Sequence, residues 1–221
     1  ENETAVQAAL SGLIKDKTVL VIAHRIRTVM NADQIVLLSG GRVALHISLD
    51  RVAEQISPKK DIDGMHPLNL GHIMAGNKQA HLPSTVKAVM DLLQFFEIAV
   101  PTKDICVIGK PLSVLLLNER ATVSNCHTGT QHLAHYTKKA DIVISSTGSI
   151  GLITKEHIKK GAVVIDVGFN FKDNKAYGDV RYDEVAEVAS AITPVPGGVG
   201  SVTTAALAQQ VANAAQWLQE K

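Results

Sequence analysis

Ala162-Val-Val-Ile-Asp-Val-Gly168 is one of four short strand-like runs that decide the fold of this chain. The other three are Ile105–Gly109, Ala121–Cys126 and Asp141–Thr147. Segments compatible with helices separate the runs, at residues 112–118, 130–139 and 154–159. Strands that are apolar throughout and alternate with helices are typical of a parallel sheet covered on both faces. The sequence therefore predicts an α/β fold built on a doubly wound, Rossmann-like parallel sheet.

Small or polar residues follow each of the four predicted strands. In a doubly wound sheet, ligands bind outside the carboxyl ends of the strands. The residues at those ends are Gly109-Lys110-Pro111, Cys126-His127-Thr128, Thr147-Gly148 and Asp166-Val-Gly168-Phe169-Asn170. Glycine and small side chains let a ligand approach the backbone closely, although glycine is also ordinary turn chemistry. Four such ends in succession favour a nucleotide site.

A loop rich in proline and glycine, Thr193-Pro-Val-Pro-Gly-Gly-Val-Gly-Ser201, precedes an alanine-rich segment that reads as a helix from Val202 to Leu218. The prolines stiffen the loop, and the glycines permit positive φ angles. Ser201 is a candidate N-cap, so the positive end of the helix would face the loop and attract an anionic or carbonyl oxygen. We expect an active-site loop here, with a simple connector as the alternative.

Composition narrows the function classes. The chain has 221 residues, of which 46% are hydrophobic and 4% aromatic, and its net charge is +1. A core of useful size can form, but a dedicated nucleic-acid surface is not expected. No apolar run is long enough to cross a bilayer, so we expect no membrane partner and a cytoplasmic location. We expect Cys106 and Cys126 to be buried free thiols, and no metal site, because the spacing of the cysteines and histidines fits no standard zinc pattern.

The first 44 residues differ in character from the rest. Their pattern is a coarse α-β-α-β, with strands at Thr18–Ala23 and Ile35–Leu38. The segment Glu1–Val43 resembles the end of an ABC-transporter ATPase domain, and His24 would match the switch histidine of that family. Because the sequence has no GxxxxGK[ST] phosphate loop, we expect no ATPase function. We predict a domain boundary near residue 44, followed by helices at Ser48–Gln55 and Val86–Phe96.

Five motifs in residues 45–221 carry a second resemblance. They are Ser57-Pro-Lys-Lys-Asp-Ile-Asp63-Gly64, Leu82-Pro-Ser-Thr85, Gly161-Ala-Val-Val-Ile-Asp-Val-Gly168, Gly178-Asp-Val180 and Ile192-Thr-Pro-Val-Pro-Gly-Gly-Val-Gly200. Together they resemble the bifunctional methylenetetrahydrofolate dehydrogenase/methenyltetrahydrofolate cyclohydrolase family. The resemblance implies oxidation of 5,10-methylenetetrahydrofolate by NAD(P)⁺, followed by hydrolysis of the methenyl cation to 10-formyltetrahydrofolate. It also implies a homodimer.

The same resemblance implies roles for individual residues. Asp63 would bind the pterin ring and is the catalytic candidate, although an Asp-Gly pair is also typical of a plain turn. Substrate contacts would come from Asp63, Pro196, Gly197, Gly198, Val199, Gly200 and Thr203. Cofactor contacts would come from Gly109, Lys110, Thr128, Thr147, Gly148, Gly168 and Phe169. The second strand ends without an acidic residue to bind a ribose hydroxyl, which favours NADP over NAD.

Three family features are absent from the sequence. The first is the Tyr-x-x-x-Lys motif that carries the family's catalytic lysine, and the second is the glutamine-bearing strand that helps to hold that lysine. The third is the longer connection after the first strand, where Gly109 runs directly into Lys110-Pro111. A connection of two or three residues still suits a strand-to-helix turn. Three functions remain open at this point: a folate-dependent oxidoreductase, a non-catalytic chain that keeps the fold, and an ATPase fragment.

Overall fold

The computed structural model describes residues 35–39, 42–47, 56–77, 80–109, 112–173 and 175–219. The chain divides into two compact units, Glu1–Ser57 and Pro58–Lys221. In the first unit, strand β1 (Ile35–Ser39) pairs antiparallel with β2 (Arg42–Ile47). The strand expected at residues 35–38 is confirmed, and β2 was not predicted. His24, the other features of residues 1–34 and the helix expected at residues 48–55 lie outside the described residues. The boundary near residue 44 stays a prediction.

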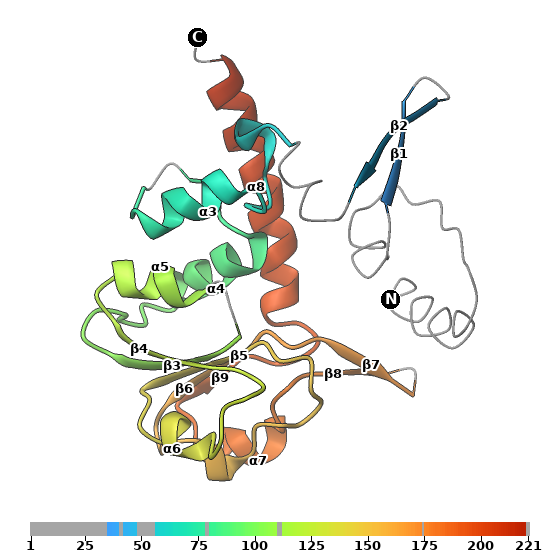
Figure 1. The fold of residues 1–221 in the computed structure, drawn as a ribbon. Coiled ribbons are helices and arrows are strands. Elements are labelled where there is room, and N and C mark those ends of the chain that lie inside the picture. The colour runs from blue at the N-terminus through green and yellow to red at the C-terminus, as the bar shows by residue number, and fades with distance from the viewer. Residues whose placement is uncertain are drawn as a thin grey trace. The chain divides into compact units, whose positions relative to one another are not determined.

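The second unit is built on a parallel sheet with strand order β4-β3-β5-β6-β9, drawn in Figure 1. Its strands are β3 (Asp104–Ile108), β4 (Thr122–Cys126), β5 (Ile142–Ser145), β6 (Val163–Asp166) and β9 (Ala191–Ile192). Helices cover both faces of this sheet. The predicted α/β class and the four predicted strands are therefore confirmed.

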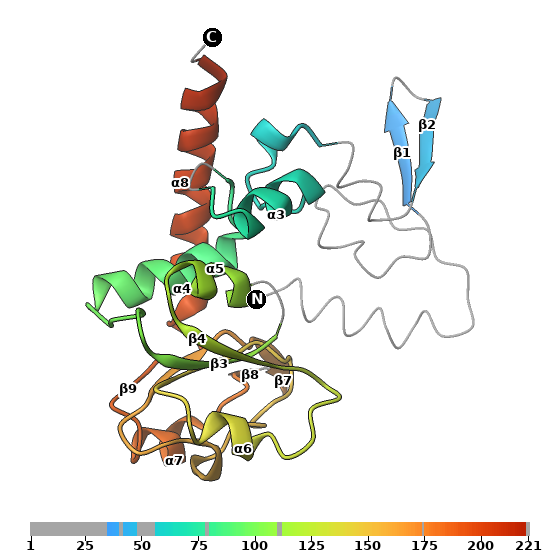
Figure 2. The ribbon, with the colours of Figure 1, turned by 60° about the vertical axis from the view of Figure 1, so that its left-hand side comes forward.

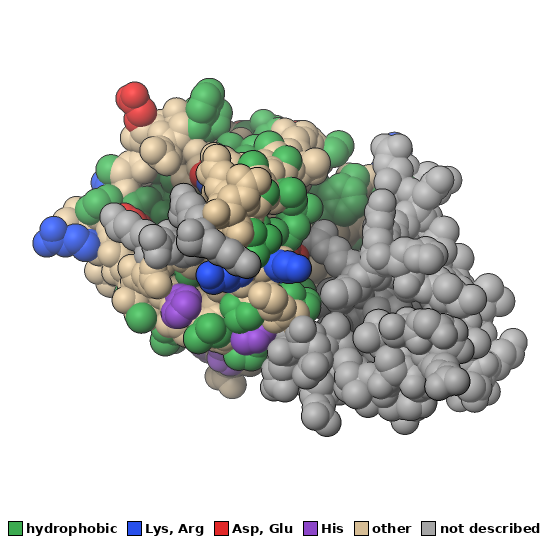
Figure 3. Space-filling view, turned by 90° about the horizontal axis from the view of Figure 1, so that it is seen from above, with side chains coloured by type: hydrophobic (Ala, Val, Ile, Leu, Met, Phe, Trp, Pro, Cys, Tyr) green, Lys and Arg blue, Asp and Glu red, His purple; other side chains and the backbone are tan. Residues whose placement is uncertain are grey.

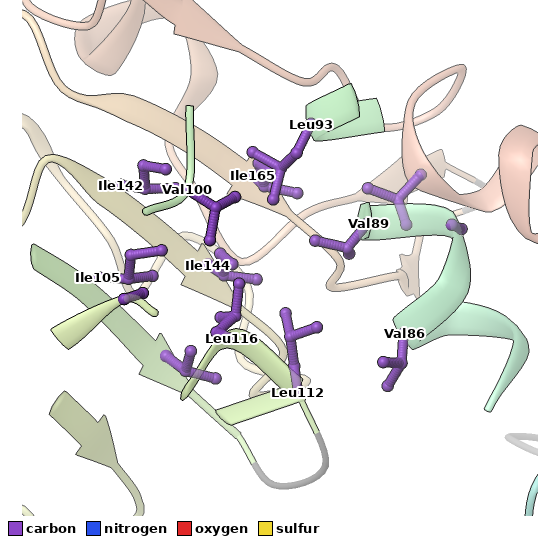
Figure 4. Close-up of a cluster of buried hydrophobic side chains, with 14 of the residues drawn as sticks. Val86, Val89, Leu93, Val100, Ile105, Leu112, Leu116, Ile142, Ile144 and Ile165 are labelled. Carbon is purple, nitrogen blue, oxygen red and sulfur yellow. The ribbon is translucent and has the colours of Figure 1, made fainter. Parts of the chain in front are cut away.

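Residues in each strand alternate between two apolar layers. Ile105 and Val107 of β3 lie in one cluster with α4 (Ser84–Phe95), α5 (Leu112–Asn118) and the first turns of α8 (Val199–Gln219), as Figure 4 shows in part. Cys106 and Ile108 face the other layer, which contains α7 (Tyr182–Ala186) and residues next to α6 (Ala134–Thr137). Because β3, β5 and β6 are buried on both faces, they read as nearly continuous apolar runs in the sequence, whereas β4 at the edge of the sheet is largely exposed.

Several short elements differ from the prediction. Residues 154–159 form only a 3-10 turn, η3 (Lys155–His157), because Ile153 and Ile158 on either side are both buried and leave room for one turn. Within 130–139 only α6 is α-helical. Further elements that were not predicted are β9, α7, the hairpin of β7 (Asn170–Lys172) and β8 (Lys175–Tyr177), η2 (Pro58–Lys60) and α3 (Pro67–Met74). Helix α3 begins in the expected polar loop because Pro67 opens it and Nδ1 of His66 accepts a hydrogen bond from Leu68 N–H.

The last helix begins three residues earlier than predicted. Ser201 is not the N-cap, since its N–H donates to Gly198 O within the first turn. Gly197 has a φ of +100°, and the Val199 side chain is buried in the core, so the chain turns and becomes helical at once. Figure 2 shows α8 extending well beyond the sheet. Near its end, Trp217 packs against His81 with ring centroids 4.7 Å apart.

Helices α3 and α8 both carry exposed apolar side chains. The exposed residues are Leu68, Leu70 and Met74 on α3, and Leu207, Val211 and Leu218 on α8. Figure 3 shows hydrophobic side chains among polar ones on the end of the unit to which α8 points. None of the described helices combines the length and the apolar character needed to cross a lipid bilayer.

Candidate functional site

The strand order places a topological switch point between β3 and its neighbours. After β3 the chain forms β4 on one side of it, and then returns to form β5 on the other side. Ligands of doubly wound sheets bind at such points, outside the carboxyl ends of the strands. Gly109 follows β3 with a φ of +144°, and a Cβ atom there would lie 3.2 Å from the backbone oxygen of Ser146, which follows β5. The two loops therefore meet at a position that favours glycine.

The loop after β5 is held by one buried carboxylate, that of Asp179. Its Oδ2 accepts hydrogen bonds from Thr147 N–H at 2.6 Å and from Ser145 Oγ at 3.1 Å. Its Oδ1 accepts from Ser149 N–H at 3.0 Å and from the Asn170 amide at 3.1 Å. Asp179 is fully buried, so these bonds operate without competition from water. The N–H of exposed Gly148, between the two held residues, donates to no described residue and is available to a ligand.

A second buried carboxylate lies directly beside the first. Asp166, the last residue of β6, accepts hydrogen bonds from the N–H groups of Gly168 (2.9 Å), Asp179 (3.1 Å) and Val180 (2.9 Å). A Cβ atom on Gly168 would overlap the Asp179 carboxyl group, and one on Gly178 would overlap Asp166 Oδ2. Both glycines are therefore required by the close approach of backbone to carboxylate. Asp166 and Asp179 are part of two of the family motifs, but the sequence alone predicted no role for either residue.

Burial raises the pKa of the Asp166 carboxyl to about 6, and the nearby Asp179 carboxylate adds to the rise, whereas the three N–H donors oppose it. The folded protein therefore takes up this proton at a higher pH than the unfolded chain, whose aspartates titrate at about 3.9. The contribution of Asp166 to the free energy of unfolding should rise as the pH falls from about 6 to about 4. Carbon-13 NMR of the Asp166 carboxyl should show a midpoint near 6. A midpoint below about 4.5 would contradict this assignment.

The proline- and glycine-rich loop joins the same edge of the sheet. Thr193 Oγ1 accepts a hydrogen bond of 2.8 Å from Asp166 N–H, and Val195 lies next to Gly178. Gly198 has no space for a Cβ because Pro194 O lies against it.

The predicted substrate residues of this loop and of α8 differ in what they can offer a ligand. Pro196, Gly197 and Gly200 are exposed, whereas Val199 is 3% exposed and faces the core. Thr203 is half-buried, and its hydroxyl donates to Val199 O at 3.0 Å. The backbone of the loop and the first turn of α8 are thus more accessible than the side chain of Val199.

Asp63 lies in a different cluster from this loop. Its Oδ1 accepts a hydrogen bond of 3.0 Å from Ser84 N–H at the start of α4, while its Oδ2 bonds to none of the described residues. Asp61 instead stabilises the loop in which both aspartates lie. Its buried carboxylate accepts hydrogen bonds from Met65 N–H, His66 N–H and the Asn69 side-chain amide. Asp63 therefore has one structural bond and one oxygen free for a ligand.

Gln210 of α8 connects this loop to the rest of the unit. Its side chain is 3% exposed, donates to Ile62 O at 2.7 Å and accepts from Leu82 N–H at 3.0 Å. Residues Val199 and Gln210 are separated by about 16 Å along the helix axis.

Replacing Gln210 by alanine should lower the free energy of unfolding by about 2 to 4 kcal/mol, because it leaves Ile62 O and Leu82 N–H without partners. Urea unfolding followed by circular dichroism measures this change. Gln209→Ala is the matched control, since Gln209 is the exposed neighbour on the same helix and its removal should change stability by less than about 0.5 kcal/mol. Equal effects of the two substitutions would show that the Gln210 bonds carry no stability.

Two of the remaining predicted cofactor residues, Thr128 and Phe169, lie on exposed loops. Thr128 follows β4 and Phe169 follows β6, where its side chain is 52% exposed. Lys110 lies outside the described residues. Sequence reasoning missed Asn125, whose amide nitrogen, in the orientation that satisfies its neighbours, donates to Gly109 O at 2.7 Å and to Ser113 Oγ at 3.2 Å. It ties the turn after β3 to the neighbouring strand.

Comparison with known proteins agrees with this geometry. The family model for the tetrahydrofolate dehydrogenase/cyclohydrolase NAD(P)-binding domain matches residues 83–219. A "Bifunctional protein FolD" of Brevibacillus brevis is 42% identical over 210 residues, which cover 92% of this chain and 73% of the relative. A protein of the same description from Bacillus subtilis is 45% identical and covers 77% of this chain and 62% of the relative.

Solved structures give the same result. The bifunctional methylenetetrahydrofolate dehydrogenase/cyclohydrolase of Campylobacter jejuni is 41% identical, with a TM-score of 0.75 over 77% of this chain and 63% of that chain. The Trypanosoma brucei enzyme, solved with NADP cofactor and an inhibitor, is 34% identical, with a TM-score of 0.75 over 81% of this chain and 66% of that chain. This chain thus spans roughly two thirds of the length of these proteins. It belongs to the tetrahydrofolate dehydrogenase/cyclohydrolase family, and residues 83–219 are its NAD(P)-binding domain.

Proposed function

We propose that the chain takes part in one-carbon folate metabolism as an NADP-dependent methylenetetrahydrofolate dehydrogenase and methenyltetrahydrofolate cyclohydrolase. Family membership supports the proposal, and the geometry that carries it is the switch point between β3 and β5. There, the N–H group of Gly148, in the loop beside Gly109, is open to a dinucleotide, whereas the N–H groups of Thr147 and Ser149 are held by Asp179. NADP, once bound, accepts a hydride from the bridging methylene group of the folate.

The residues of this chain supply binding and orientation for that step. Asp179 fixes the loop that carries Gly148 N–H, a donor suited to a phosphate or ribose oxygen. The free Oδ2 of Asp63 suits the N–H groups of an aminopyrimidine-like edge such as that of a pterin. The exposed backbone from Pro196 to Gly200 would line the cleft between these two groups. The pterin would then lie at Asp63 and the dinucleotide at the switch point, with the methylene bridge between them.

Three finer statements belong to the same proposal. NADP is favoured over NAD because the end of β4, at Cys126-His127-Thr128, offers no carboxylate to repel a 2′-phosphate. We propose a homodimer and a cytoplasmic location by analogy with the family. The proposed partners are the folate substrates, and we propose neither a nucleic-acid nor a membrane partner.

The proposal is tested by incubating the purified chain with NADP⁺ and 5,10-methylenetetrahydrofolate while following reduced nicotinamide and the methenyl product separately. We expect hydride transfer from the wild type. Asp63→Asn should abolish turnover yet leave NADP⁺ affinity unchanged, because the amide oxygen still caps α4 while the charge is lost. The control is Asp91→Asn, which removes one carboxylate from helix α4 itself and should leave turnover unchanged. Folded protein that binds neither ligand would overturn the proposal and favour a chain that keeps only the fold.

A further inference from the structure

A cavity of about 230 Å³ lies at the opposite edge of the sheet from the candidate site. Its lining comes from the amino ends of β3, β5 and β6 and from the residues that follow α4. Three cations, Lys103, Lys159 and Lys160, share it with the single carboxylate of Asp141 over an apolar wall that includes Ile98 and Ile142. The residues used by the proposed function all lie at the carboxyl edge or along α8.

The charges in this cavity do not balance. Lys159 Nζ donates to Asp141 Oδ1 at 2.7 Å, and this pairing uses the only carboxylate in the lining. The pairing with Lys159, and then the N–H of Asp104, hold the pKa of Asp141 below its ordinary value, and the charge of Lys103 acts in the same direction. Within the described part of the chain, the side-chain ammonium groups of Lys103 and Lys160 make no hydrogen bond or ion pair. Two positive charges, on half-buried Lys103 and exposed Lys160, therefore remain without a carboxylate partner in the lining and would attract an anion.

The backbone contributes little to recognition here. Ala162 N–H donates to Lys159 O at 3.0 Å, and Val163 N–H donates to Asp141 O at 2.9 Å, so neither is available to a ligand. Selectivity must therefore come from the lysine side chains and from size. Pockets for drug-sized ligands and cofactors usually have volumes of about 300 to 1,000 Å³. This cavity is smaller, so it suits a compact ligand better than a dinucleotide or a folate.

We propose that this cavity, which we call the lysine pocket and define by Lys103, Lys159, Lys160 and Asp141, binds a compact oxyanion carrying two or more negative charges, of the phosphate type. Lys103 and Lys160 supply the uncompensated charge, and Lys159 is held in place by Asp141. The proposal is independent of the proposed function, because no residue of the lysine pocket belongs to the candidate dinucleotide or folate site.

Inorganic phosphate is the probe, titrated into the full chain while amide signals are followed by two-dimensional NMR at constant ionic strength held with chloride. We expect saturable shifts of the Lys103 and Gly161 signals, with a Kd of about 1 mM or tighter. Lys103→Gln and Lys160→Gln should each weaken binding about two- to fivefold, the size expected for one exposed ion pair, and the double variant by about tenfold.

The control is Lys172→Gln with Lys175→Gln on the hairpin β7–β8, which removes the same net charge elsewhere. Its phosphate affinity should equal that of the wild type. Absence of saturable shifts would overturn the proposal, and so would equal weakening in the two double variants, since that would show only a general effect of net charge. A titration with succinate distinguishes phosphate-type anions from dicarboxylates: weaker binding of succinate supports the proposal, and tighter binding overturns the assignment to phosphate-type anions.

Discussion

Gly168→Ala should lower the free energy of unfolding by about 3 kcal/mol or more and leave little folded protein at physiological temperature. The added methyl group would occupy the space of the Asp179 carboxyl group, and that carboxylate cannot move away without releasing the four donors that it holds. Thermal and urea unfolding followed by circular dichroism measure the effect. Gly178→Ala should act similarly, because its methyl group would overlap Asp166 Oδ2.

Gly71→Ala provides the matched control. Gly71 lies within α3, and no atom lies within 4 Å of the position its Cβ would take. Alanine also has a higher helix propensity than glycine, so this variant should be as stable as the wild type or more stable by up to about 1 kcal/mol. If Gly168→Ala behaves like Gly71→Ala, the close packing of backbone and carboxylate described here is incorrect.

Asp179→Ala should produce the second large effect, a loss of about 3 to 5 kcal/mol in stability together with a loss of NADP⁺ binding. The substitution leaves the N–H groups of Thr147 and Ser149 unpaired, together with the side chains of Ser145 and Asn170. The loop that presents Gly148 is then no longer fixed. Stability is measured by urea unfolding, and NADP⁺ affinity by calorimetry under conditions in which the variant is folded.

Asp183→Ala is the control for charge, because Asp183 is an exposed aspartate on nearby α7. It should change neither stability nor affinity measurably. Asn170→Ala separates the two effects of Asp179, since it removes one of the four donors and leaves both loop N–H bonds in place. It should weaken NADP⁺ binding far less than Asp179→Ala. Equal weakening would mean that the loop is not held as the structure shows.

The parts of the fold that were predictable are those with strong local signals. Each central strand is a run of apolar residues with both faces buried, so composition alone identifies it. The strand β9 was missed because two residues carry no periodicity, and it forms through pairing with β6. The start of α8 was misplaced because burial of Val199, a tertiary effect, outweighed the capping preference of Ser201.

In the candidate site, too, residues with a local sequence signal could be predicted and residues joined by long-range contacts could not. Glycines at strand ends can be recognised in the sequence because they follow apolar runs directly, as Gly109 and Gly168 do. The carboxylate pair could not be found in this way, since Asp166 and Asp179 lie 13 residues apart and come together only when β6 meets the segment after β8. The role of Gln210 was still harder to predict, because its hydrogen-bond partner Ile62 lies 148 residues away in the sequence. Long-range hydrogen bonds leave no periodic pattern in a sequence.

The most direct test of the dinucleotide site is an NADP⁺ titration of the full chain followed by amide NMR signals. The account predicts saturable shifts of Gly109, Gly148 and Ser149 at the carboxyl edge of the sheet, with the signals of Lys103 and Gly161 at the opposite edge unchanged. NAD⁺ should give the same pattern at higher concentration. Absence of shifts at the carboxyl edge, or shifts confined to the lysine pocket, would contradict the placement of the cofactor at the switch point between β3 and β5.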